Sequence, residues 1–237
     1  MRLQRIQPSF ENPLSRTQVI LGWVYVAVHI FLLPELLDLY ARFSPDPVSD
    51  TVCNFIWYGV GIVFCLTILH SLLRDGFDVL ADNLGRCLVA MLLAFFLDYV
   101  LSGVAGLALM LLESASPDMS QETVMEAVRT EPGVKAATIF LAPIVEECLF
   151  RGVVFGSIRT RGRVWAFVIS AAVFAAYHVW GYAVNDPGQW IYILEYLPVS
   201  VALAWLYERT GSIWPPIFFH MGINAMSIYV TEALSRL

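Results

Sequence analysis

Charged side chains are scarce in this chain of 237 residues. Asp, Glu, Lys and Arg together make up 14% of it, whereas 58% of the residues are hydrophobic. Soluble globular domains carry about 25% charged residues, so this composition excludes a water-soluble domain and predicts an integral membrane protein. The formal net charge is −6, and no basic patch of the kind that nucleic acid requires is present. Nucleic acid is therefore a poor candidate partner.

Signatures of disulfide-linked, zinc-binding and secreted proteins are also missing. The four cysteines lie far apart, mostly within apolar segments, and form no CxxC pair: Cys53, Cys65, Cys87 and Cys148. Such spacing favours neither a disulfide framework nor a zinc site. The apolar run after the first 17 residues has no small-x-small cleavage site, so we expect a retained first helix and not a signal peptide. Internal repeats and low-complexity tracts are absent as well.

Long apolar stretches are what the sequence has instead. Seven of them approach the roughly 20 residues needed to cross about 30 Å of hydrocarbon: 18–40, 55–73, 86–112, 136–157, 163–183, 190–208 and 213–232. Turn and breaker residues separate them, among them Arg74-Asp75-Gly76. The predicted fold class is all-α, a polytopic transmembrane helical bundle of about seven spans, with eight as the alternative. A break at Asp98, Gly103 or Gly106 in the third stretch would add the eighth.

Basic residues are unevenly distributed between the two sides of this predicted bundle. With the N-terminus inside, nine arginines fall in inner segments: Arg2, Arg5, Arg16, Arg74, Arg86, Arg159, Arg161, Arg163 and Arg209. Four basic residues fall outside: Arg42, Arg129, Lys135 and Arg236. Because Lys and Arg beside a span are retained on the cytoplasmic side, this count predicts a cytoplasmic N-terminus and an outer C-terminus.

The polar segment 113–135 divides the chain into two regions. Ser116-Pro117 is typical of a helix start, which predicts a short amphipathic helix from Met119 to Arg129. This helix could lie on the outer membrane surface, cover a cavity, or be a solvated connector. We therefore divide the chain into N-terminal transmembrane helices plus an amphipathic connector, 1–135, and a transmembrane helical core, 136–237, that carries the candidate catalytic residues.

Two adjacent acids and an arginine interrupt the fourth apolar stretch. A charged residue near the bilayer centre costs at least about 2.5–3.5 kcal/mol, so Glu146, Glu147 and Arg151 need partners, a wet cavity or a function. Glu147 and Arg151 are four residues apart and share one helical face, where they can pair. Glu146 projects about 100° round the helix from Glu147, so the two acids have different surroundings. Gly152-x-x-x-Gly156 then allows close helix approach, with a matching small surface in the fifth stretch: Ser170, Ala171, Ala172, Ala175 and Ala176.

Two later stretches supply further polar side chains. The fifth ends with Phe174-x-x-x-His178, and the seventh carries His220 and Asn224 on one helical face. A carboxylate and an imidazole that converge on one water can remove its proton and later protonate a leaving amine. Glu146 with His178 fits that role, whereas His220 and Asn224 can donate hydrogen bonds to a developing oxyanion. The pattern thus indicates hydrolysis of a peptide bond, with no cofactor.

Other interpretations remain open on the residues alone. Each polar group could be an independently satisfied core residue, as we expect for His29 and His70, and Asp98 and Glu195 have no assigned role. A zinc metalloprotease could use two histidines and a glutamate, although no HExxH motif is present. A proton-coupled transporter also places such groups at midplane, but no inverted repeat is evident. A non-enzymatic membrane binding or immunity protein is the further alternative.

Three motifs together resemble one known family. Glu146-Glu147-x-x-x-Arg151, Phe174-x-x-x-His178 and His220-x-x-x-Asn224 occur in the order and spacing of the CPBP family, the CAAX proteases and bacteriocin-processing enzymes also called the ABI family. The resemblance covers about 136–232. It implies an intramembrane glutamic protease in which Glu146 and His178 activate water and His220 and Asn224 form the oxyanion hole. Glu147 and Arg151 would then be supporting residues.

The resemblance also implies a partner and a location. The substrate would be a membrane-associated protein or peptide, such as a prenylated tail, a bacteriocin leader, a sorting-signal tail or a membrane-anchored regulator. The short loops and compact length resemble bacterial members of the family, which places the protein in the inner membrane of a bacterium. Neither the oligomeric state nor the membrane face to which the site opens follows from the sequence.

Overall fold

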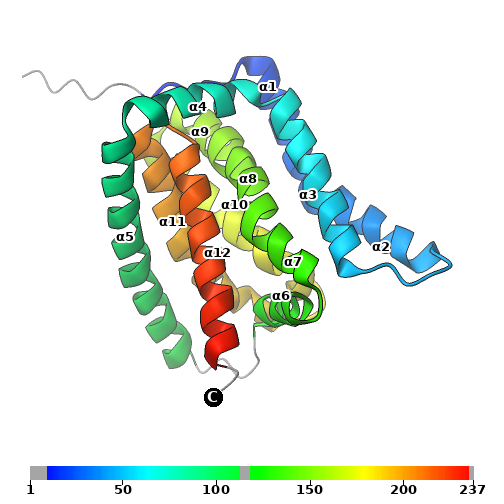
Figure 1. Ribbon diagram of the computed structural model, residues 1–237. Coiled ribbons are helices and arrows are strands. Elements are labelled where there is room, and N and C mark those ends of the chain that lie inside the picture. Colours follow the sequence, from blue (N-terminus) through cyan, green and yellow to red (C-terminus); the bar gives the residue numbers. More distant parts are fainter. Residues whose placement is uncertain (1–9, 113–117, 235–237) are drawn as a thin grey trace, which may run out of the picture.

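The chain folds as a bundle of helices in the computed structural model, which describes residues 10–112 and 118–234 (Figure 1). No strand occurs within these ranges, which confirms the all-α class. The elements in chain order are α1 (Arg16–Ala27), η1 (Val28–Leu32), α2 (Leu33–Phe43), α3 (Asp50–Thr67), α4 (His70–Asp82), α5 (Leu84–Leu111), α6 (Met119–Thr130), α7 (Pro132–Ala136), η2 (Ala137–Leu141), α8 (Ala142–Glu146), η3 (Glu147–Phe155), α9 (Gly156–Arg159), α10 (Arg163–Ala183), η4 (Pro187–Tyr192), α11 (Ile193–Thr210) and α12 (Trp214–Leu234).

Within the described residues, five helices are long and apolar enough to cross a membrane. They are Arg16–Phe43, Asp50–Thr67, Leu84–Leu111, Arg163–Ala183 and Pro187–Thr210. The two remaining predicted spans, 136–157 and 213–232, also lie in helices, but these carry the charged and polar residues singled out above, which lower their apolar character. The structure therefore supports a polytopic membrane protein, whereas the count of seven spans stays a prediction.

Two predicted boundaries are wrong. The second apolar stretch, 55–73, is not one span, because α3 ends at Thr67 and a separate amphipathic helix, α4, begins at His70. Arg74-Asp75-Gly76, which the sequence predicts as a break, lies inside α4. Leu72 and Leu73 on the apolar side of α4 are buried, and this burial outweighs the local turn propensity of Arg74-Asp75-Gly76. Helix α5, by contrast, runs unbroken past Asp98, so no eighth span arises there.

Two prolines inside long helices are each preceded by a π-helical turn. Leu33 N–H bonds to the carbonyl of Val28, just before Pro34, and Ala142 N–H bonds to that of Ala137, just before Pro143. A proline has no N–H and its ring clashes with the carbonyl four residues earlier. Wider turns relieve that clash, so both helices continue through their prolines without ending.

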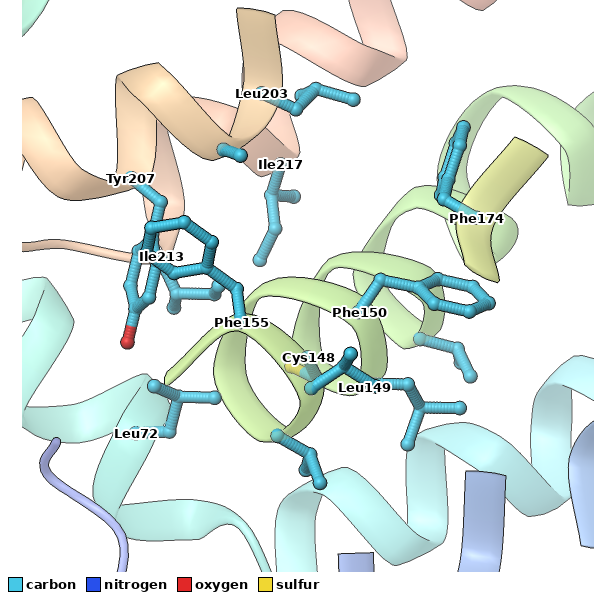
Figure 2. Packing of buried hydrophobic residues seen from close by; sticks show 14 of the residues in the cluster. Leu72, Cys148, Leu149, Phe150, Phe155, Phe174, Leu203, Tyr207, Ile213 and Ile217 are labelled. Atoms are coloured by element: carbon cyan, nitrogen blue, oxygen red, sulfur yellow. The ribbon is translucent and has the colours of Figure 1, made fainter. Parts of the chain in front are cut away.

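The core of the bundle is the run from Pro132 to Arg159, which we call the central helix. It is formed by α7, η2, α8, η3 and α9. Every residue from Glu147 to Phe155 is buried. Figure 2 shows Phe150 directed toward Phe174 of α10 and Phe155 toward Tyr207 of α11, with Leu72 of α4 at the lower left. The acids therefore lie in a helix that other helices surround.

Gly152 allows a close approach between the central helix and α4. A Cβ atom there would lie 2.3 Å from Cδ2 of Leu72, so a larger residue would force the Leu72 side chain to move. The expected partner of this glycine face, the small surface of the fifth stretch, is not its neighbour. Helix α10 contacts the central helix elsewhere, where Ser170 Oγ donates to the carbonyl of Phe150 at 3.1 Å. Several neighbours surround this helix, so the glycine motif alone could not identify which one it contacts.

One end of the bundle collects most of its basic residues. Helices meet there through hydrogen bonds from Ser212 Oγ to the carbonyl of Gly76, 2.6 Å, and from Trp214 Nε1 to that of Leu73, 2.8 Å. We call it the arginine-rich end, the upper end in Figure 1. Its described arginines are Arg16, Arg74, Arg86, Arg159, Arg161, Arg163 and Arg209, whereas Arg42, Arg129 and Lys135 lie toward the opposite end.

Helix α6 is the predicted amphipathic helix, and Glu131, which follows it, forms hydrogen bonds with the start of α3. The predicted start at Ser116-Pro117 lies outside the described residues; the cap is Asp118, whose carboxylate accepts from the N–H groups of Ser120 and Gln121. Glu131 then accepts from the N–H of Asp50 at 3.1 Å and of Thr51 at 2.7 Å. Because these donors belong to the first turn of α3, Glu131 holds the start of that helix.

Replacing Glu131 by alanine is expected to loosen the start of α3 at neutral pH. The Thr51 side chain and the N–H groups of Thr51 and Asp50 hold the pKa of the Glu131 carboxyl below its usual range. A carboxyl with a lowered pKa stabilises the fold when ionised and loses that effect as pH falls through its folded-state value. Amide exchange at Thr51 and Val52 should therefore be faster in the variant at pH 7 and equal to wild type at acid pH. Glu126→Ala is the control, and equal exchange at pH 7 would contradict this role.

Candidate active site

Glu146 lies at the middle of the central helix and is almost fully buried. Its Oε1 atom is 3.3 Å from the hydroxyl of Tyr58 on α3. Its Oε2 atom is 3.9 Å from Nε2 of His178 and 3.9 Å from Nε2 of His220. Three helices far apart in the sequence, 142–146, 163–183 and 214–234, thus bring one carboxylate oxygen and two imidazole nitrogens together. Distances of 3.9 Å exceed a direct hydrogen bond, and a bridging water fits contacts of this kind.

The tautomer of His178 follows from its backbone contact. Its Nδ1 atom is 2.9 Å from the carbonyl of Phe174, one turn earlier on α10. A carbonyl only accepts, so Nδ1 carries a hydrogen and, in the neutral ring, Nε2 keeps a lone pair directed at Glu146. The ring stacks on Tyr196, centroids 4.5 Å apart, and its side chain is 22% exposed. His178 is therefore the most accessible member of the cluster.

Glu147 links His220 to Arg151. Its Oε1 atom lies 2.8 Å from Nδ1 of His220 and 3.0 Å from Nη1 of Arg151. A carboxylate paired with a guanidinium accepts, so Nδ1 of His220 is the donor and its Nε2 atom faces Glu146. The carboxylate therefore fixes the orientation of the imidazole, as second-sphere carboxylates do for catalytic histidines.

Arg151 is held in the protein interior by contacts of both its terminal nitrogens, whereas its Nε atom has no hydrogen-bond partner among the described residues. Its side chain and that of Glu147 are 0% exposed. Nη2 donates to the carbonyl of Ser200 at 3.2 Å and to Ser200 Oγ at 3.0 Å. The guanidinium also lies over the ring of Phe174, 4.3 Å from its centroid. The helical spacing alone predicts the pair with Glu147, whereas the contacts with Ser200 depend on how α11 packs.

Asn224 is held one turn beyond His220 on α12. Its Nδ2 atom donates to the carbonyl of Thr138, 2.9 Å away, in the π-helical part of the central helix. An amide group has two hydrogens, so this bond occupies one donor and leaves the second. The oxyanion role expected for Asn224 stays a prediction.

Tyr58 is a site residue that sequence reasoning missed. It lies 88 residues before Glu146 and belongs to no recognisable motif. The available signal is a phenol within an apolar span, and a buried tyrosine hydroxyl usually has a partner. Because Tyr58 contacts Oε1, it leaves Oε2 for the histidines.

Replacing Tyr58 by phenylalanine should lower turnover about tenfold with little change in KM. The substitution removes one hydrogen bond to a carboxylate, worth about 1.5–3 kcal/mol, and keeps the ring. Steady-state kinetics measure the effect, with Tyr25→Phe, a buried tyrosine of α1, as the matched control. Unchanged turnover in Tyr58→Phe would exclude this positioning role.

The helix α6 reaches the site through Tyr196. The Tyr196 hydroxyl lies 3.2 Å from Ser120 Oγ and 3.4 Å from Asp118 Oδ2, both at the start of α6. The Tyr196 ring stacks on His178. We call the buried cluster of Glu146, Glu147, Arg151, His178 and His220 the polar centre. Of the three locations that the sequence left open for α6, a cover over this polar centre agrees best with these contacts.

The other singled-out groups lie outside the polar centre. The expectation of a satisfied core residue is wrong for both of the other histidines. His70 is exposed, although its Nδ1 atom meets the carbonyl of Thr67 at 3.0 Å. His29 is fully buried, but within the described residues neither of its ring nitrogens has a hydrogen-bond partner. The His29 ring lies 5.9 Å from that of Tyr58. Asp98 is buried in α5, and Glu195 lies in the first turn of α11. In residues 10–112 and 118–234, no three His, Cys, Asp or Glu side chains are arranged to hold a metal ion.

Fold and site together define a polytopic membrane protein with a buried polar centre shared by three helices. Residues 132–226 match the family described as type II CAAX prenyl endopeptidase Rce1-like. All seven residues of the three motifs fall within this match, which agrees with their resemblance to the CPBP family. The family match indicates a peptidase that works in a membrane.

One of the similar proteins carries the name of a membrane peptidase. The chain is 21% identical over 222 residues to "Putative membrane peptidase YdiL" of Bacillus subtilis, covering 89% of this chain and 86% of that protein. It is 36% identical over 84 residues to UPF0177 protein YxdF and 33% identical over 98 residues to UPF0177 protein YaiF, both of Lactococcus lactis. Those two alignments span 42% and 39% of the Lactococcus proteins. No solved structure matches the chain.

Proposed function

We propose that this protein is an intramembrane endopeptidase that hydrolyses a peptide bond with a water activated by Glu146 and His178. The observation that supports this most strongly is the convergence of two imidazole nitrogens on one oxygen of Glu146, each 3.9 Å away. A water held between Glu146 Oε2 and Nε2 of His178 finds two acceptors for its two hydrogens. Attack on the scissile carbonyl transfers one proton to this pair, which then protonates the leaving amine.

His220 supplies the positive charge that the oxyanion needs. Its Nδ1–H is committed to Glu147, so Nε2 donates a hydrogen bond only when the ring is an imidazolium. In that form Glu146 and Glu147 balance Arg151 and His220, and the buried cluster has no net formal charge. Buried charges persist when they are paired in this way. The remaining amide hydrogen of Asn224 would be the second oxyanion donor.

The substrate in this proposal is a membrane-associated protein or peptide. The family description names a prenyl endopeptidase, so a prenylated C-terminal peptide is the first probe. Purified protein in detergent should cleave it, keep its activity after exhaustive chelation and lose it in Glu146→Ala. Activity that disappears on chelation and returns with zinc would replace this mechanism with a metalloprotease. Failure to cleave the prenylated probe, with cleavage of another membrane peptide, would change only the substrate class.

The proposal also covers the orientation of the protein in the membrane and the roles of its two regions, 1–135 and 136–237. We infer a bacterial inner-membrane protein with a cytoplasmic N-terminus, because seven arginines at the arginine-rich end face the cytoplasm in that orientation. The catalytic groups come from 136–237, whereas 1–135 contributes Tyr58 and the α6 cover. Cysteine accessibility at the exposed residues Asp46 and Arg161 in intact cells tests the orientation: only a cysteine at position 46 should react with an impermeant reagent.

Alanine at His220 or Asn224 is expected to lower kcat by about 10²-fold while leaving KM within about twofold. Groups that act mainly on the transition state affect turnover and not ground-state binding. The control is Ser227→Ala, an exposed residue on the same helix. A rise in KM equal to the fall in kcat/KM would instead assign these residues to substrate binding.

A further inference from the structure

A basic hollow lies at the arginine-rich end, away from the catalytic cluster. It encloses about 450 Å³ between the start of α5, the end of the central helix, the start of α10 and the end of α11. Its charged lining residues are Arg86, Arg159, Arg163, Arg209, Glu11 and Glu208. Arg159 follows Glu146 by 13 residues, which is about 20 Å along a helix. The hollow is therefore a separate site.

The arginines of this hollow outnumber its acids by two, four against two. Glu208 is shared, since its Oε1 meets Nε of Arg159 at 2.5 Å and its Oε2 meets Nε of Arg163 at 2.9 Å. Arg86 instead donates to the backbone carbonyl of Arg209 at 3.0 Å. Among residues 10–112 and 118–234, no carboxylate forms an ion pair with either of these two arginines. Arg86 and Arg209, which line the same hollow, thus have guanidinium donors that no described carboxylate uses, and these are available to an anion.

An apolar groove continues from these same two arginines. It encloses about 310 Å³ and is lined by Gly85, Arg86, Val89, Ala90, Leu93 and Arg209. Gly85, Val89 and Leu93 follow one another at four-residue spacing and so lie on one face of α5. Val89 and Leu93 are more than half exposed on a helix that is apolar and long enough to cross the membrane. The groove therefore leads from the charged end of the bundle into the hydrocarbon region.

We infer that this surface binds an anionic phospholipid, with its phosphate at Arg86 and Arg209 and an acyl chain along Val89 and Leu93. Charge complementarity favours the phosphate, because Arg pairs with phosphate oxygens through several N–H donors. The adjoining apolar groove favours a lipid over a free anion. Basic pockets between spans on the cytoplasmic side are typical sites for anionic headgroups. The inference does not depend on the proposed peptidase activity.

The test is binding of short-chain phosphatidylglycerol to the purified full-length protein, measured by native mass spectrometry. Phosphatidylcholine of equal chain length and inorganic phosphate are the comparison ligands. We expect at least tenfold tighter binding of phosphatidylglycerol than of phosphatidylcholine. The double variant Arg86→Gln, Arg209→Gln should lose at least tenfold of that affinity, whereas Arg74→Gln, an exposed arginine at the same end paired with Asp75, should not.

Leu93→Gln tests the acyl-chain part separately, because this exposed residue contributes no charge. It should weaken phosphatidylglycerol binding several-fold. Equal affinity for the two lipids, or equal losses in the double variant and Arg74→Gln, would overturn the proposal. So would binding that Leu93→Gln leaves unchanged and that inorganic phosphate competes away at equal concentration. Circular dichroism and melting temperature establish that each variant is folded.

Discussion

Replacing Glu146 by alanine is expected to lower the cleavage rate by about 10³-fold or more, and His178→Ala should have a similar effect. Removing a general acid or base typically costs about 10²–10⁴-fold, and in the proposed mechanism both groups act on one water. Glu146 Oε2 and His178 Nε2 lie 3.9 Å apart, so loss of either leaves that water with one acceptor. Single-turnover rates on a cleavable membrane peptide measure the effect.

The double variant distinguishes shared from independent action. If both residues activate one water, Glu146→Ala, His178→Ala should be no slower than the worse single variant, because groups that act as a unit are strongly non-additive. If the two residues acted independently, the rate loss of the double variant would be the product of the two single losses. Asp98→Asn is the control, since it removes a buried carboxylate from α5, away from the polar centre. A Glu146→Gln protein that is folded and fully active would remove Glu146 from the chemistry.

Replacing Arg151 by alanine is expected to destabilise the fold by about 3–5 kcal/mol, the usual effect of leaving one member of a buried ion pair without its partner. Glu147 would keep a buried charge with only His220 beside it, and the two contacts of Arg151 with Ser200 would be lost. The yield of membrane-inserted protein and its melting temperature in detergent should both fall sharply.

Arg42→Ala is the matched control for that loss. Arg42 pairs with Asp38 at the same four-residue spacing, 2.6 Å apart, but both side chains are largely exposed. Exposed pairs contribute about 0–1 kcal/mol, so this variant should keep its yield. Glu147→Ala, Arg151→Ala should recover part of the stability but not the activity, because His220 loses the carboxylate that orients it. Normal yield and melting temperature in Arg151→Ala would contradict the role assigned to the pair.

Contacts within one helix of the polar centre could be predicted from the sequence, whereas contacts between its helices could not. The Glu147–Arg151 pair follows from helical spacing, and the structure has it at 3.0 Å. The chemistry of the side chains and the resemblance of the three motifs to one family predict that Glu146, His178 and His220 lie together. The contact of Glu147 with His220 joins residues 73 apart and depends on the packing of α12 against the central helix. Tyr58 and Ser200 reach the site only through tertiary packing, which no spacing rule encodes.

The fold shows a similar division between local and tertiary information. Apolar length predicted the helices, and Gly211, with φ of 70°, ends α11 where its sequence indicates a turn. The break at Ile68–Leu69 could not be predicted in the same way, because both residues are apolar and lack turn chemistry. The turn there forms because the apolar side of α4 packs across the central helix at Gly152, a contact that only the folded chain contains.

The most direct test of the central claim compares membrane-protein termini by mass spectrometry in cells that carry wild type, Glu146→Ala, His178→Ala or Asp98→Asn at equal expression. The account predicts that at least one membrane-associated protein keeps its uncleaved terminus in Glu146→Ala and His178→Ala. The same protein should be processed in wild type and Asp98→Asn. Identical termini in all four strains, with each variant folded and inserted, would contradict a peptidase centred on Glu146 and His178.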